Sequence, residues 1–351
     1  MMSIRKTAIN ILAAALCIML IVYADISVSA AANAVDRCVN ILIPSLFVFL
    51  AASNILIRSK AYKILSLPFY PIAKYVFKIP YELFSVLLIS NLAGFPVGAS
   101  MLVELTKQNI IDKKTASLLQ CVCYGGGPSF AVGVIGIYLY SDIRVGLIIC
   151  LSAFLANITA ALIICRALKP KIKGNDKKRP FTCEELIVST ENAGRSMLMI
   201  CAMVIIFSVI LACVERLICL YVHIPLQAKT LLMSVFEISS IASLENARIA
   251  FVPVISALFG FGGVCVLLQI IATVKGRYSL TPFFVTRLPI ALINYLYARL
   301  LCSHLIDDAQ YCMAVGKGFT VKFNNFIPSL CLILMIFLLL FKKGVAFFDD
   351  M

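Results

Sequence analysis

Residues 88–105 read LISNLAGFPVGASMLVEL, and this apolar stretch contains the features that decide the fold. Asn91 places an amide within it, and Gly94 and Gly98 lie on either side of Pro96. Glycine permits backbone conformations that other residues avoid, and proline disfavours the helical conformation at the residue before it. The stretch therefore predicts two half-helices joined by a Gly-Phe-Pro-Val-Gly tip, instead of one uninterrupted membrane helix.

The composition of the whole chain is that of a membrane protein. Of its 351 residues 62% are hydrophobic and only 14% are charged, whereas soluble domains have about 25% charged residues. Runs of about 20 apolar residues recur and predict transmembrane helices, and the short alternating segments of a β-barrel are missing. We expect an all-α polytopic membrane protein with about eight transmembrane helices and two re-entrant hairpins. The expected spans lie near residues 7–24, 38–57, 117–140, 145–167, 197–221, 250–273, 281–303 and 325–341.

Charge and cysteine content exclude several classes of protein. The net charge of +14 comes from bases in short loops, which indicates attraction to an anionic cytoplasmic leaflet and no role in nucleic-acid binding. Most of the 14 cysteines lie in apolar runs, and there are only two histidines, so we expect neither a disulfide framework nor a metal site or other cofactor. The apolar stretch 7–24 is long enough to span a bilayer, which favours an uncleaved first helix over a signal peptide.

The bases also decide the path of segment 81–103. Its length could just cross a hydrocarbon core of about 30 Å. Crossing would move Lys107, Lys113, Lys114 and the basic loop KPKIKGNDKKRP (169–180) to the outer side. The positive-inside rule therefore favours a hairpin that enters and leaves on the cytoplasmic side. Exposed peptide groups at membrane depth are tolerated only against protein or a water-filled cavity, so this hairpin implies a cavity.

The next span, 117–140, is predicted to be broken as well. It contains the sequence CVCYGGGPSFAVG, in which Gly126, Gly127 and Pro128 precede Ser129. A simple kink is the alternative, since glycine and proline are common in membrane helices. A break would leave the positive end of a half-helix dipole at Ser129, where an anion could bind.

After the basic loop the pattern restarts. LLMSVFEISSIASLENA occupies the place of the hairpin at 229–246, and ALFGFGGVCVLLQI forms a second broken span at 250–273. The segments before the basic loop and those after it form two sets that are expected to begin on opposite sides of the membrane. Such inverted repeats are typical of secondary transporters. The second hairpin rests on this symmetry, because charge barely distinguishes re-entry from crossing. The expected units are an N-terminal helix at 1–32, gate repeats at 33–168 and 197–303, a cytoplasmic loop with an amphipathic helix at 169–196, and a last span and tail at 304–351.

Polar side chains at membrane depth identify the candidate site. Glu237 lies in the centre of the second hairpin; it could couple a proton or a cation, or hydrogen-bond within the bundle. Asn91 could contribute to a site or cap its half-helix. Asn294 is expected to join helices. Arg287 is expected to extend to the cytoplasmic surface, with a cavity-facing position that would suit a carboxylate substrate as the alternative. The candidate substrate-binding residues are Ser90, Asn91, Gly94, Pro96, Gly98, Gly126, Gly127, Pro128, Ser129, Glu237, Ser239, Ser240 and Gln269, the last with inter-helix bonding as its alternative.

The order of these motifs resembles the sporulation integral membrane proteins of the YlbJ (SpoVV) type. The resemblance runs from about Asn33 to Leu301 and is carried by GFPVGASMLVELTKQNIIDKKTASLL, GGGPSFAVGVIGIYLY and MSVFEISSIASL. That family belongs with the nucleoside-recognition gate-domain proteins and is similar in outline to concentrative nucleoside transporters. The resemblance implies export of dipicolinic acid from the mother cell across the outer forespore membrane. The chain departs from the family at Ser239-Ser240-Ile241, where the family has Thr-Asn-Gly.

Three functions follow from these patterns. The first is a secondary transporter of a small anionic aromatic or heterocyclic metabolite, coupled to a proton or sodium. The second is a nucleoside transporter, and the third is a sporulation scaffold that recruits partners through the basic loop. An enzyme is not expected, since the chain contains no nucleophile–base set or P-loop. We expect both termini to be cytoplasmic and leave a homo-oligomer open.

Overall fold

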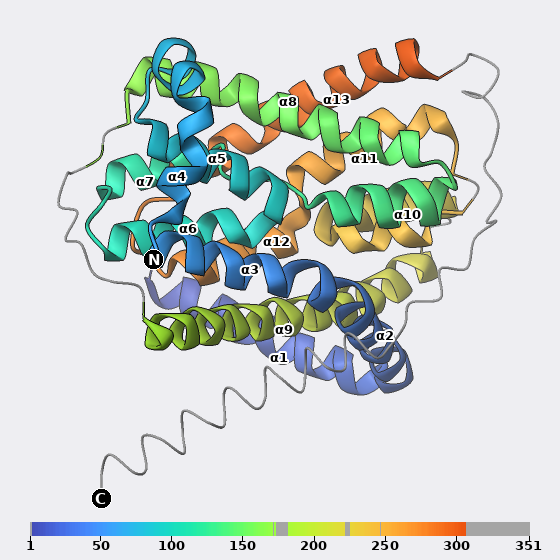
Figure 1. Ribbon diagram of the computed structural model, residues 1–351. Helices are drawn as coiled ribbons and strands as arrows, with labels where there is room; N and C mark the ends of the chain where they lie inside the picture. The colour runs from blue at the N-terminus through green and yellow to red at the C-terminus, as the bar shows by residue number, and fades with distance from the viewer. Residues whose placement is uncertain (1, 171, 173–181, 222–224, 246, 307–351) are drawn as a thin grey trace, which may run out of the picture.

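A computed structural model describes residues 2–170, 172, 182–221, 225–245 and 247–306 (Figure 1). These residues form helices and connections without a strand, which confirms the all-α expectation. Four helices are long and apolar enough to cross a membrane: Ile143–Leu168, Cys183–Ile218, Ile249–Val274 and Thr281–Leu305. Two further helices, bent by 93° at Tyr23, raise the number of candidate spans to five if the pair is counted as one span. The chain is therefore a multi-pass membrane protein, and the expected span at 325–341 lies outside the described residues.

The N-terminal part is nearly continuous helix. α1 (Met2–Val22) bends at Tyr23 into α2 (Ala24–Arg37), and a π-helical segment (Cys38–Leu42) leads into α3 (Ile43–Arg58). Short helices follow, namely α4 (Ala61–Ser66), a 3₁₀ turn (Leu67–Phe69) and a π-helical turn (Ile72–Phe77). α3 runs most of the way across the molecule beside α9 (Figure 1).

The chain reverses at Gly94, between α5 (Tyr81–Ala93) and α6 (Phe95–Lys107). A Cβ built on Gly98 would lie 2.8 Å from the Cβ of Ser90, whereas residues eight apart in one straight helix are separated by about 12 Å. The turn is narrower than the sequence predicted. Gly94 alone leaves the helical region, with φ 105° and ψ 161°, and Pro96 lies in the first turn of α6, where its missing N–H costs no hydrogen bond.

A break in the next span brings extended backbone into the centre of the molecule. α7 (Lys113–Gln120) ends well before a π-helical segment (Ser129–Leu139), and residues 124–127 between them are not helical. α8 (Ile143–Leu168) then crosses the whole molecule in the direction opposite to that of the π-helical segment (Figure 1). The triple glycine therefore coincides with a true break, as its sequence predicted, and not with a kink.

The second half begins with one long helix, α9 (Cys183–Tyr221). The expectation of a separate amphipathic helix before a span at 197–221 is wrong, because no proline separates them and the 39 residues stay helical. After α10 (Leu226–Phe236) the chain reverses at Glu237 into a 3₁₀ helix (Ile238–Ser243). The side chain of Gln227 donates to the carbonyl of Glu245 at 3.4 Å, which closes this reversal at its base.

The last described elements contain a second break. A 3₁₀ turn (Ile249–Phe251) leads into α11 (Val252–Phe261), which is separated from α12 (Gly263–Val274) by Gly262 in the left-handed region at φ 83°. α13 (Thr281–Leu305) packs along α11 and α8. Between residues 250 and 273 the structure therefore has two half-helices joined at a glycine.

Glycines let the breaks touch one another. A Cβ on Gly126 would collide with the ring of Phe259, and one on Gly262 would collide with the hydroxyl of Tyr124. A Cβ on Gly263 would lie 3.0 Å from the carbonyl oxygen of Phe236, at the second reversal. The two broken spans therefore cross where each is interrupted, and a reversal packs against each break.

Ion pairs join helix ends at one end of the molecule. Arg58 at the end of α3 lies 3.0 Å from Glu104 of α6 and 2.6 Å from Glu185 of α9, and Lys107 lies 3.7 Å from Glu104. α6 therefore returns to the end of the molecule at which α3 finishes, the left end in Figure 1. We name this the Arg58 end.

We predict that Gly98→Ala destabilises the fold while Gly133→Ala does not. The added methyl at residue 98 would meet the backbone of Cys123 and the side chain of Ser90, whereas a Cβ on Gly133 meets nothing within 4 Å. Overpacking of this kind costs about 1–3 kcal/mol. Thermal unfolding in detergent, followed with a thiol-reactive dye because the chain has no tryptophan, should show a lower midpoint for Gly98→Ala alone. Equal midpoints for the two variants would contradict the close contact.

Candidate functional site

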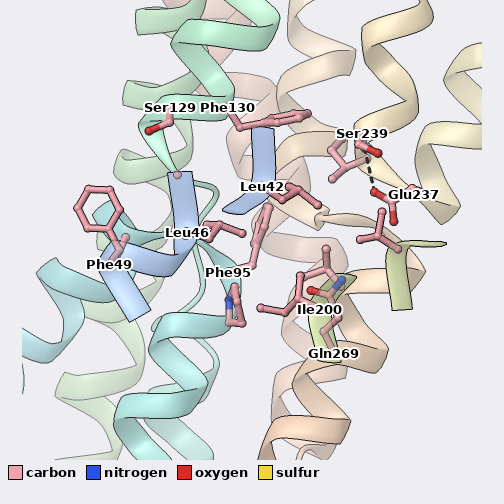
Figure 2. Close-up of a pocket in the computed structure, with 17 residues that line it drawn as sticks. Leu42, Leu46, Phe49, Phe95, Ser129, Phe130, Ile200, Glu237, Ser239 and Gln269 are labelled. Carbon is pink, nitrogen blue, oxygen red and sulfur yellow. Dashed lines mark hydrogen bonds between the residues drawn. The ribbon is translucent and has the colours of Figure 1, made fainter. Parts of the chain in front are cut away.

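A pocket lies where the two reversals and the first break meet (Figure 2). Its walls come from α3, the Gly94 reversal, the start of the segment at Ser129, α9, the Glu237 reversal and α12. Most lining side chains are apolar, including Phe95 and Phe130. The polar ones are few and come from both halves of the chain: Ser129, Glu237, Ser239 and Gln269.

Glu237 carries the only carboxyl group among these lining residues. Its side chain is 2% exposed, and its Oε1 accepts a hydrogen bond of 3.1 Å from the backbone N–H of Ser239, the dashed line in Figure 2. Oε2 has no hydrogen-bond partner in the described part of the chain, although the thiol of Cys265 lies close to the carboxyl group. A buried carboxyl with a free oxygen in a pocket is suited to bind a proton, a cation or a donor group of a ligand.

Two helical segments begin at the pocket and face it with their positive ends. α6 starts at Phe95 and the π-helical segment starts at Ser129, and both residues line the pocket. The helix dipole is positive at that end, where the first N–H groups lack the usual helical partner. The N–H groups of Val97, Phe130 and Ala131 donate to the carbonyls of Gly94 and Gly127, so the backbone donors at the two helix starts are those of Phe95 and Ser129. Figure 2 shows Ser129 and Phe130 on one side of the pocket and Glu237 with Ser239 on another. The pocket therefore offers an acceptor side and a donor side.

The structure divides the residues that the sequence indicated. Seven of them line the pocket, namely Gly94, Pro96, Gly127, Ser129, Glu237, Ser239 and Gln269. The others do not: Ser90, Asn91, Gly98, Gly126, Pro128 and Ser240. Gly98 and Gly126 serve close packing, and the Ser90 hydroxyl donates to the carbonyl of Leu87 within its own helix at 2.9 Å. Ser240 lines a separate cavity on the far side of the second reversal.

Asn91 stabilises the broken backbone and does not reach the pocket. Its Nδ2 donates to the carbonyl of Val122 at 3.1 Å, and its Oδ1 accepts from Asn157 of α8 at 2.7 Å. Asn157 also donates to the carbonyl of Tyr124 at 2.8 Å. The two amides thus bind carbonyl groups that the break releases. Sequence reasoning missed Asn157, and its only signal was an amide in the middle of an apolar span.

Arg287 does not extend to the surface, so the sequence expectation for it is wrong. It is 1% exposed in α13, and its guanidinium lies 4.6 Å from the ring centre of Tyr124 and 4.8 Å from that of Phe283. It donates to the carbonyl of Cys121, just beyond α7. The aromatic rings and this carbonyl stabilise the cation in part, whereas its buried Nε and Nη1 have no hydrogen-bond partner in the described part of the chain.

Two further amides were expected to join helices. For Asn294 this is confirmed, since its Oδ1 accepts from the hydroxyl of Ser256 in α11 at 2.9 Å. Gln269 lines the pocket, and its side-chain hydrogen bond goes to Cys265 in the same helix at 3.5 Å. Aromatic residues that the sequence did not single out, Phe95 and Phe130, form the pocket walls.

Comparison with known proteins assigns no family, since no protein-family model, curated protein or solved structure matches the chain. The pocket itself must therefore carry the functional argument.

We predict that Asn157→Leu lowers the unfolding midpoint, because it leaves the oxygens of Tyr124 and Asn91 without this donor in the bundle. An unsatisfied buried acceptor costs about 1–3 kcal/mol. Ser303→Ala is the matched control, since that exposed hydroxyl bonds only within its own helix, to Leu300. A midpoint for Asn157→Leu equal to that of the control in the thiol-dye assay would show that the amide does not stabilise the break.

Proposed function

We propose that this chain is a secondary transporter that carries a small, planar, carboxylated heteroaromatic metabolite through the central pocket. The observation that supports this most directly is the position of the pocket. It lies where two reversals and a helix break meet inside a bundle of apolar helices. Interrupted helices at membrane depth occur where they line a cavity or hold a solute.

Two sets of elements in the same order support an alternating-access mechanism. The first set is α3, the α5–α6 reversal, a broken span and α8; the second is α9, the α10 reversal, a broken span and α13. In Figure 1 α3 runs towards the Arg58 end and α9 runs away from it, which is the arrangement expected of inverted repeats. In this mechanism the two reversals are re-entrant hairpins that open the pocket to opposite sides in turn.

The orientation follows from the positive-inside rule. Helix ends that carry Arg58, Lys107, Lys113, Arg166 and Lys275 lie at the Arg58 end, and we assign this end to the cytoplasm. The N-terminus starts on the same side, and one more span in the C-terminal region would return the C-terminus there. By resemblance the membrane is the bacterial cell membrane or the outer forespore membrane.

The charge of the pocket supports coupling to a proton. No lysine or arginine is among its lining residues, whereas Glu237 is. Two like charges about 5 Å apart repel by about 3 kcal/mol at an effective dielectric constant of about 20, which would weaken the binding of an anion more than a hundredfold. Binding of a carboxylate at the two helix N-termini therefore favours a protonated Glu237, and the anion and the proton move together.

Dipicolinic acid is the first candidate substrate, on the strength of the family resemblance. Its planar ring would lie against aromatic walls such as Phe95 and Phe130, and one carboxylate would accept from the backbone N–H of Ser129. It is a dianion at neutral pH, so the second carboxylate would share a proton with Glu237. A nucleoside is the second candidate, favoured by Glu237 and Gln269, which could bind hydroxyl groups or a base edge without any charge on the ligand.

We predict uptake of labelled dipicolinate by liposomes that contain the purified chain, increasing as the outside pH falls from about 8 to about 6. Because the anion binds with a proton, a more acidic exterior raises the fraction of pockets that can accept it. Labelled uridine and adenosine are measured in parallel. Uptake of the nucleosides alone would identify a nucleoside as the substrate instead of dipicolinate. Uptake of neither would contradict transport and favour the non-transporting scaffold.

We predict that Glu237→Gln abolishes the pH dependence of dipicolinate uptake and reduces uptake driven by a pH gradient by at least about tenfold, equivalent to about 1.4 kcal/mol. The amide is neutral at every pH, so it cannot exchange the coupled proton. Glu82→Gln is the control, because Glu82 lies in the first turn of α5 and outside the pocket. An unchanged pH profile in Glu237→Gln would exclude Glu237 as the coupling group.

A further inference from the structure

Three cavities follow one another along α9. The first, at the Arg58 end, is lined from α9 by Asn192, Ser196 and neighbouring residues. The central pocket is lined by Ile200 and Val204. A third cavity, at the opposite end, is lined from α9 by residues between Ser208 and Glu215. All three therefore have α9 as a shared wall.

The spacing of the lining residues makes this wall continuous. Asn192, Ser196, Ile200, Val204, Ser208 and Ala212 follow one another at intervals of four, which is about one turn of a helix. Asn192 to Glu215 spans about 35 Å at 1.5 Å per residue, compared with about 30 Å for the hydrocarbon core of a bilayer. The series begins with the polar Asn192 and Ser196, has Ile200 and Val204 in the middle, and ends with Ser208 and the small Ala212.

Other elements also line two neighbouring cavities, with residues that are adjacent or about one turn apart. Gln269 lines the central pocket and Thr273, one turn later in α12, lines the first cavity. Pro96 and Ser100 are related in the same way in α6. On the other side, Ser239 lines the central pocket and Ser240 lines the third cavity. The space open to a water-sized sphere is about 220, 60 and 350 Å³ in order, so it is smallest in the central pocket.

The two outer cavities differ in charge. The one at the Arg58 end is lined by four basic side chains, Lys107, Arg195, Lys275 and Arg277, and by one acid, Glu104. Glu104 is paired with Arg58 and Lys107, and Arg195 lies 2.8 Å from Glu191 in its own helix. The one at the opposite end has two basic and two acidic side chains, and its Lys229 lies 2.6 Å from Glu215. Only the first cavity has an excess of positive charge to concentrate anions.

We propose that the three cavities are parts of one transmembrane path along the Asn192–Glu215 face of α9, and that the basic cavity at the Arg58 end is its anion-selective mouth. The proposal rests on the transporter function and extends it, because it names the route of the substrate and states that the basic cavity selects an anion. Capture at this mouth raises the local concentration of the anion, which is then held at the narrow central pocket.

The route is tested by single cysteine substitutions in the otherwise native chain, reconstituted in liposomes. Ser196→Cys, Val204→Cys and Ala212→Cys should react with an anionic methanethiosulfonate added to both sides, as measured on α9 peptides by mass spectrometry. Leu198→Cys and Ile206→Cys are the controls, since these side chains are 43% and 51% exposed on the outer surface of the bundle, where lipid would exclude the reagent. Reaction at both ends without reaction at residue 204, or equal reaction at the controls, would overturn the route.

The selectivity of the mouth is tested with the same reagent. Replacing Lys275 and Arg277 together by glutamine should slow anionic labelling of Ser196→Cys about fivefold and speed labelling by a cationic analogue, as Coulomb interactions over about 8 Å of water predict. Labelling of Ala212→Cys should not change. If the double substitution changed the labelling rate of Ser196→Cys equally for the anionic and the cationic reagent, the anion-selective mouth would be overturned.

These outcomes are separable from the proposed function. Labelling along the α9 face in liposomes that transport neither dipicolinate nor nucleosides would contradict the transporter and leave a water-filled path. Transport without labelling at residue 204 would preserve the transporter and contradict this route.

Discussion

The structure depends on one constraint: backbone groups released by a broken helix must find partners inside an apolar bundle, because lipid offers none. Side chains from neighbouring helices satisfy this requirement. Asn91, Asn157 and Arg287 donate to the carbonyls of residues 121–124, and the hydroxyl of Tyr124 donates to the carbonyl of Phe261 at the second break. These side chains thus bind the backbone at the breaks. Other buried polar atoms, among them Glu237 Oε2, Ser239 Oγ and two nitrogens of Arg287, have no hydrogen-bond partner in the described part of the chain.

That division explains the character of the pocket. Because the amides near the first break are already paired, its polar surface comes from helix N-termini and from the Glu237 reversal. Two helix N-termini and one carboxyl group whose Oε2 has no hydrogen-bond partner in the described part of the chain thus border an apolar cavity. Under the proposed function, a planar solute would place an acceptor group at these N-termini, and a proton on Glu237 would remove the repulsion between like charges.

Glycine has a different role at each place. Gly94 and Gly262 adopt positive φ angles and allow the chain to turn, whereas Gly98 and Gly126 occupy positions where a side chain would strike a neighbouring segment. The same residue type therefore creates the turns and allows the two broken spans to cross in contact. The pocket beside that crossing is bordered by residues from both halves of the chain.

The sequence by itself determined the features that depend on local chemistry. Apolar length indicated the membrane helices, Gly-Pro clusters indicated the first break, and the position of lysines indicated that the chain returns after Gly94, because each of these signals acts over a few residues. Only the tertiary structure decided which polar groups face the pocket. Asn91 and Glu237 are both polar residues in apolar segments, but one is bound by Asn157, more than 60 residues away in the chain, and the other keeps a free oxygen. Likewise Arg287 is buried because the rings of Tyr124 and Phe283 flank it, and partners so distant in sequence leave no local pattern.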